Sequence, residues 1–111
     1  FAAKIDYVTG ACSSPRAVSS ADVNGDGKPD LLVANQNANT VSVLTNQGDG
    51  TFTKLDYTTG SGPRSVSSAD VNGDGKPDLL VANFTGNTIS VLTNNGDGTF
   101  APKPRAGSPF P

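Results

Sequence analysis

Short apolar and alternating segments, separated by turn residues, run along the whole chain. Asp30–Ala34 is almost wholly apolar, which is typical of a strand buried on both faces. Thr40–Thr45 is rich in β-branched residues, and Thr51–Tyr57 alternates between apolar and polar side chains. Ser19–Val23, with a short lead-in, is the fourth extended segment. Since no window has a helical period, the pattern predicts an all-β fold.

The four segments occur twice. Residues 15–52 and 63–100 are identical at 32 of 38 aligned positions, and the copies lie 48 residues apart. The differing pairs are Ala17/Ser65, Gln36/Phe84, Asn37/Thr85, Ala38/Gly86, Val41/Ile89 and Gln47/Asn95. Three of the pairs are adjacent, which indicates a variable surface turn. Four strands in a repeat of this length are typical of a propeller blade. We therefore predict a β-propeller with two four-stranded antiparallel blades per chain.

The ends of the chain are out of phase with the repeats. The expected units are residues 1–10 as the outer strand of an adjacent blade, 11–60 as the first blade, and 61–111 as the second blade with its Pro-rich end. Phe1–Tyr7 resembles Phe52–Tyr57, the fourth strand of the first repeat. Pro102 and Pro104 weaken the last strand. A second interpretation is therefore that Phe1–Tyr7 supplies the outer strand of this last blade, in the same chain or a neighbouring one.

One loop is repeated without change, as Asp22–Asp30 and Asp70–Asp78. Oxygen-bearing side chains stand at its positions 1, 3, 5 and 9, with a backbone carbonyl at position 7, and such oxygen ligands suit Ca²⁺. The predicted ligands are Asp22, Asn24, Asp26, the carbonyl of Lys28 and Asp30, then Asp70, Asn72, Asp74, the carbonyl of Lys76 and Asp78. Gly27 and Gly75 permit the left-handed turn that folds each loop. The sequence predicts two calcium ions per chain.

These loops begin like an EF-hand loop, but the likeness ends after position 9. Position 12 holds Val33 or Val81 instead of a bidentate Glu, and the residues that follow the loop read as a strand. A simple hairpin turn is the competing interpretation, and three carboxylates that repel one another argue against it. Without the Glu we expect weak binding, on the order of 10⁻⁴–10⁻³ M. The segments Asn46–Thr51 and Asn94–Thr99 carry one carboxylate each and predict hairpin turns.

Composition excludes several classes of function. The 111 residues carry a net charge of -2 and no basic cluster, so no nucleic-acid partner is expected. No apolar run reaches the ~20 residues of a membrane span, so no membrane insertion is expected. The absence of His, of a paired acid and base outside the loops and of an activated Ser predicts that the chain is not an enzyme. Cys12 is expected to be a passive loop residue, with an intermolecular disulfide as the main alternative. The start at Phe1 suggests a mature or excised segment.

Residues 15–100 closely resemble the FG-GAP and VCBS repeats. The resemblance rests on Gly62–Asn83 and Thr88–Phe100, and on the first copy from Pro15. It implies β-propeller blades, usually seven per ring, with calcium in the loop between the first two strands of each blade. Such repeats occur in integrin α-chains, certain fungal lectins and many secreted or surface bacterial proteins. The resemblance therefore implies an extracellular or cell-surface location, and calcium at the ten positions named above.

Two blades cannot close a ring, which leaves two explanations. The chain is a fragment of a larger secreted or surface protein, or it assembles with itself, as a trimer with six blades or a tetramer with eight. We expect a calcium-stabilised binding or scaffold module, with a carbohydrate-binding lectin propeller as the alternative. Its glycan or protein ligand is not identified by the sequence. Phe84, in the variable turn, is the one aromatic residue expected outside the core.

Overall fold

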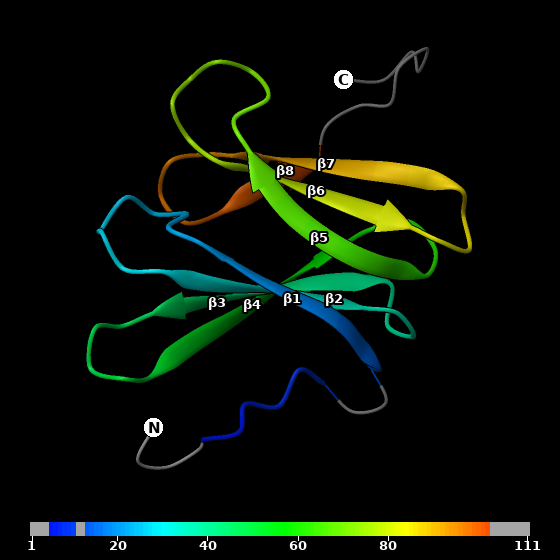
Figure 1. Ribbon diagram of the computed structural model, residues 1–111, viewed down its shortest axis with the longest axis horizontal. Helices are drawn as coiled ribbons and strands as arrows, with labels where there is room; N and C mark the ends of the chain where they lie inside the picture. Colours follow the sequence, from blue (N-terminus) through cyan, green and yellow to red (C-terminus); the bar gives the residue numbers. More distant parts are fainter. Residues whose placement is uncertain (1–4, 11–12, 103–111) are drawn as a thin grey trace.

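The computed structural model describes residues 5–10 and 13–102 and contains two sheets joined by one linker (Figure 1). The strands are β1 (Pro15–Ala21), β2 (Asp30–Asn35), β3 (Thr40–Asn46), β4 (Phe52–Thr58), β5 (Pro63–Ala69), β6 (Asp78–Asn83), β7 (Thr88–Asn94) and β8 (Phe100–Pro102). The sheet orders are β1-β2-β3-β4 and β5-β6-β7-β8, with antiparallel pairing throughout. We call these sheets blade 1 and blade 2. The all-β, four-stranded prediction is confirmed.

The first strand of each repeat lies earlier than the sequence indicated. It covers Pro15–Ala21 instead of Ser19–Val23. Val23 has left the sheet because its backbone N–H donates to the side chain of Asp30, 2.9 Å away, instead of to a neighbouring strand. The early start was hidden by the small polar side chains of this segment, which give no clear alternation.

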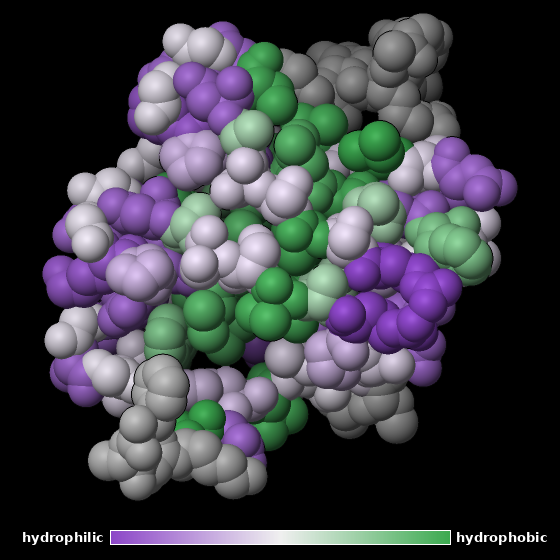
Figure 2. All heavy atoms as spheres, in the orientation of Figure 1, coloured by the Kyte–Doolittle hydropathy of each residue, from purple (hydrophilic) through white to green (hydrophobic). Residues whose placement is uncertain are grey.

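The hydrophobic core lies between the two blades. Its buried members are Val23, Leu32, Ala34, Val41 and Val43 from blade 1 and its first loop, and Val66, Leu79, Val81, Leu92 and Phe100 from blade 2. Tyr57 closes one side, edge-on to Phe100 at 5.7 Å between ring centroids. In Figure 2 hydrophobic residues form a band through the middle of both sheets, and hydrophilic residues gather at the two sides where the turns lie. Burial in one shared core therefore holds two near-identical sheets face to face.

Residues 5–10 form no strand within the single chain. Tyr7 packs edge-on against Phe52 at 5.4 Å between centroids and donates to the carbonyl of Gly50, which holds this segment against blade 1. Pairing with an adjacent blade, and the boundaries 1–10, 11–60 and 61–111, stay predictions. Residues 1–4, Cys12 and residues 103–111, Pro104 among them, lie outside the described residues. The described part of β8 has three residues, whereas β4 has seven.

Candidate metal centre

Each aspartate loop joins the first two strands of its blade. Residues 22–29 connect β1 to β2, and residues 70–77 connect β5 to β6. Gly25 and Gly27 have φ of 78° and 81°, and Gly73 and Gly75 repeat this with 79° and 84°. A Cβ on any of these glycines would meet nothing within 4 Å. The glycines are therefore needed for backbone conformation alone, and they curl the loop toward its own side chains.

The first aspartate of each loop organises the backbone around itself. In the second loop Asp70 accepts the N–H groups of Gly73 (2.9 Å), Asp74 (3.2 Å) and Gly75 (2.7 Å). Asp22 does the same in the first loop with Gly25, Asp26 and Gly27. These backbone donors, from Gly75 and Gly27 above all, hold the pKa values of Asp70 and Asp22 below the ordinary value. Both side chains are therefore carboxylates at neutral pH.

The middle of the loop adds further oxygens. Asp74 accepts the N–H of Lys76 at 3.0 Å, and Asn72 accepts the N–H of Asp74 at 3.3 Å. The first loop repeats both contacts with Asp26, Lys28 and Asn24. Each of these acceptor oxygens keeps a further lone pair for a ligand. The structure thus gathers these polar side chains in one loop, and all ten positions, the lysine carbonyls included, stay predicted ligands.

The last aspartate of each loop is buried and joins the start of its loop to the third strand of its blade. Asp78 is 0 % exposed, and its two oxygens accept the N–H groups of Val71 (3.0 Å) and Asn94 (2.8 Å). Asp30 makes the equivalent contacts with Val23 and Asn46. A buried carboxylate needs such charge-assisted hydrogen bonds to offset its desolvation. Asp78 therefore fastens the loop to β7 whether or not a cation is bound.

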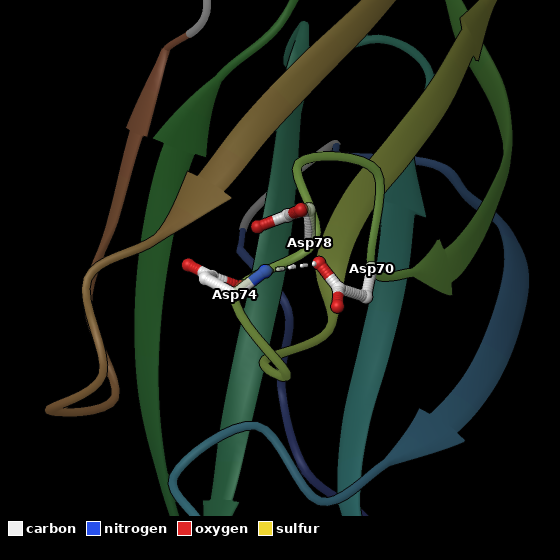
Figure 3. Close-up of side chains that lie close together, drawn as sticks. All are labelled: Asp70, Asp74 and Asp78. Carbon is white, nitrogen blue, oxygen red and sulfur yellow. Dashed lines mark hydrogen bonds between the residues drawn. The ribbon is translucent and has the colours of Figure 1, made fainter.

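The second loop brings its three carboxylates together. Oxygens of Asp70, Asp74 and Asp78 lie within 4.8 Å of one another. Figure 3 shows the three side chains close together in the loop. Oxygens that coordinate one Ca²⁺ at 2.3–2.6 Å lie up to about 5 Å apart across the ion, so this spacing fits calcium. Within the described part of the chain, the aspartates of the first loop do not gather this closely. The loops thus share sequence and backbone but differ in the closeness of their carboxylates.

Sequence reasoning missed one residue that supports each loop, the asparagine at the end of the blade's third strand. The side-chain oxygen of Asn94 accepts the N–H of Gly96. Its side-chain NH₂ donates to the carbonyls of Pro77 (2.9 Å) and Val23 (2.8 Å). Its amide joins the second loop to the first across the blade interface. Asn46 repeats the Pro29 and Gly48 contacts in blade 1. The only signal was its identical place in both repeats, because its partners are distant in sequence.

The second Asp-Gly segment of each repeat forms a turn, as predicted. Gln47 donates to the carbonyl of Thr51, and Asn95 donates to that of Thr99, both at 2.9 Å. In these turns Asp49 and Asp97 accept from the hydroxyl and N–H of the following threonine, which lowers both carboxyl pKa values. Their carboxylates are committed to local turn geometry.

Comparisons with known proteins agree with the repeat architecture. The FG-GAP-like repeat family matches the chain over residues 22–81 and again over residues 70–110. Searches of curated proteins and of solved structures gave no match. Within residues 5–10 and 13–102, no helix has the length and hydrophobicity to span a bilayer.

Proposed function

Because this chain belongs to the FG-GAP-like repeat family, we propose that it is a calcium-stabilised β-propeller unit that assembles with its own copies. The family is a non-enzymatic repeat module for binding or scaffolding, and it occurs typically in extracellular or surface proteins. Its repeats and the two packed four-stranded sheets agree with a pair of propeller blades. We place the chain at the cell surface or outside the cell on the same family grounds.

The observation that carries the calcium proposal is the gathering of three carboxylates in the second loop. Asp70, Asp74 and Asp78 would hold the ion, joined by Asn72 and the carbonyl of Lys76. Bound calcium supplies the positive charge that three adjacent carboxylates otherwise lack. Since Asp78 also bonds to Asn94 in β7, the ion would tie the loop to the sheet. The first loop is proposed as the second site, through its identical residues.

Calcium titration with matched variants tests this proposal. For a dissociation constant on the order of 10⁻⁴–10⁻³ M, each site adds about 1.4–2.7 kcal/mol of stability at ~10 mM calcium. We expect a rise in melting temperature with calcium, and a smaller rise for Asp74→Asn. Asp97→Asn removes the same charge from the neighbouring turn and serves as the control. A calcium response that is equal in the wild type and Asp74→Asn contradicts the site.

The self-assembly proposal is supported by exposed apolar residues on the outer face of each blade. Val18 on blade 1 is 65 % exposed, and Ile89 on blade 2 is 67 % exposed. Open faces of this kind are covered by neighbours in repeat proteins. Three copies would form a six-bladed ring and four copies an eight-bladed one. Native mass spectrometry with and without calcium tests this, and a folded chain that stays monomeric at all concentrations refutes it.

A glycan ligand is the second candidate, and Phe84 favours it. Its ring is 64 % exposed in the variable turn, and the guanidinium of Arg64 lies 4.5 Å from its centroid. An exposed aromatic face beside a cation offers stacking and hydrogen bonding to a sugar. A glycan array with the wild type and Phe84→Ala, each with and without calcium, tests this candidate. Equal signals from both proteins would exclude Phe84 as a sugar platform.

A further inference from the structure

The interface between the two blades is built from two surfaces, and each has an exposed counterpart at the same repeat position. Blade 1 contributes Val41, which is 0 % exposed, and its counterpart on blade 2 is Ile89 at 67 %. Blade 2 contributes Val66, which is 7 % exposed, and its counterpart on blade 1 is Val18 at 65 %. The exposed face of blade 2 around Ile89 thus repeats the face of blade 1 that packs against blade 2. The exposed face of blade 1 around Val18 likewise repeats the face of blade 2 that packs against blade 1.

Asn39 anchors the segment that enters blade 2. Its φ is 56°, its carbonyl accepts the N–H of Thr59 (3.0 Å), and its side-chain oxygen accepts the N–H of Gly62 (2.9 Å). Pro63, the first residue of β5, is then fully buried. Asn39 therefore ties the start of blade 2 to blade 1.

Asn87 has the same conformation in blade 2, but no segment of residues 5–10 and 13–102 lies on it. Its φ is 54°, and within the described residues its side chain forms no hydrogen bond of the Asn39 kind. It lines an open groove of about 490 Å³, together with Arg64, Ala82, Asn83, Phe84, Thr88 and Ile89. Ala82 is exposed in this groove, whereas its counterpart Ala34 is 0 % exposed. The groove is the equivalent of the site that Gly62 and Pro63 fill on blade 1, and no described residue fills it.

Ser14 and Pro15, which lead into blade 1, have the backbone conformation needed to fill this groove. Ser14 has φ of 55°, close to the 64° of Gly62, and both precede a proline. The carbonyl of Ser14 accepts the N–H of Gln36 at 3.0 Å, as that of Gly62 accepts the N–H of Phe84 at 2.8 Å. Pro15 is exposed, whereas Pro63 is buried. Ser14 and Pro15 thus present a free copy of the anchored segment.

Tyr7 extends the same equivalence to the outer strand. Its edge-on packing on Phe52, at 5.4 Å and 82°, matches that of Tyr57 on Phe100, at 5.7 Å and 83°. Tyr57 pairs with Val41 on the neighbouring strand, and Ile89 stands at the position of Val41. Among the described residues, β7 pairs with β8 only over Leu92–Asn94. The described part of the chain thus gives Thr88–Val91 of β7 no strand partner on this side, where a further strand could be added.

We infer that the groove at Asn87 and Ile89 receives Ser13, Ser14 and β1 of a second copy, head to tail. Asn87 accepts the N–H of Ser14 of that copy, and Val18 of that copy packs on the apolar face around Ile89. Tyr7 of that copy then lies beside Ile89 of β7. This inference rests on the proposed self-assembly and specifies its geometry. A second copy is the occupant because its surface repeats the one that fills the equivalent site within the chain.

Charge variants on the two faces test this geometry. Val18→Asp and Ile89→Asp each place a charge on one exposed face, so both should keep the wild-type fold by circular dichroism. Each variant alone should be monomeric, since head-to-tail contact needs both faces. An equimolar mixture should form a 1:1 heterodimer that grows no further, because each protein retains the face that the other has lost. Gln47→Asp, in an exposed turn, is the control and should assemble like the wild type.

A finer variant tests the anchor. Asn87→Gly keeps the left-handed backbone accessible and removes only the acceptor, so the association constant should fall about 2- to 10-fold. A wild-type chain that stays monomeric refutes the self-assembly and the docking together. An assembling wild type whose Val18→Asp and Ile89→Asp variants still assemble alone, or fail to combine in the mixture, refutes the docking alone.

Discussion

Replacing Asp78 with alanine should destabilise the fold even when no calcium is present. The carboxylate is 0 % exposed and accepts two backbone N–H groups, from Val71 and Asn94. Hydrogen bonds to a charged group contribute about 1.5–3 kcal/mol each, and both donors would be left without an acceptor. We expect a loss of about 3–5 kcal/mol. At roughly 4 °C per kcal/mol for a chain of this size, the melting temperature falls by about 12–20 °C.

Asp74→Ala is the matched comparison. Asp74 is exposed and accepts one N–H, from Lys76, so its removal should lower the free energy of unfolding by less than about 1 kcal/mol in a chelator. Thermal unfolding followed by circular dichroism in EDTA measures both variants, and repeating it in calcium adds the loss of the site. If the two variants melt within about 2 °C of each other in EDTA, the structural role assigned to the buried carboxylate is wrong.

Three further predictions concern backbone, pH and core. Gly75→Ala adds a methyl group in open space at a φ of 84°. Backbone strain alone should therefore lower the free energy of unfolding, measured in urea, by about 1–2 kcal/mol. A change near zero would contradict that strain. Burial raises the pKa of Asp56, but hydrogen bonds from Lys54 and Ser42 and the Lys54 charge outweigh it, so the folded pKa is lowered. This stability is present above the unfolded pKa and is lost as pH falls through the folded one. Because the side chains of Lys54 and Asp56 are both about a third exposed, we expect Asp56→Asn to lower the free energy of unfolding at neutral pH by under ~1 kcal/mol. The variant's stability should then fall less steeply with decreasing pH than that of the wild type. An unchanged pH dependence would contradict this assignment. Phe100→Ala removes a ring that is 5 % exposed in the core between the blades and should cost about 3–5 kcal/mol by denaturant titration, whereas a cost below ~1 kcal/mol would mean that the blades do not share a cooperative core.

Local sequence patterns were sufficient for most of the fold. Four strands per repeat followed from apolar runs and turn residues, because a strand and its hairpin partner are close in sequence. The first strand was predicted too far along the chain, at Ser19–Val23 instead of Pro15–Ala21. Its small polar residues, such as Ser19 and Ser20, give no clear apolar alternation, and the β-branched Val23 is typical of a strand. In the structure the N–H of Val23 donates to Asp30 and not to a neighbouring strand. That contact joins residues seven apart through a side chain, which a strand pattern does not encode.

The candidate site was predicted as a set of oxygens, and the structure adds how they are held. Asp30 and Asp78 were identified as ligands, but their bonds to Asn46 and Asn94, 16 residues later, could not be read from a loop motif. The contact of Asn94 with Val23 spans 71 residues and exists only once the blades pack. Distances between side chains on different strands depend on packing, which is why the ligand types were predictable and their supports were not.

The variable turn has a consequence for how this surface can change. Arg16 donates to the side chain of Gln36, while its counterpart Arg64 lies over the ring of Phe84. One arginine at a fixed place thus accommodates an amide in one blade and an aromatic ring in the other. The backbone on either side keeps the same register in both blades. In a closed ring of identical copies, amide and aromatic positions would alternate around one rim. Substitutions at this turn could therefore diversify the chemistry of that rim without altering the sheets beneath it.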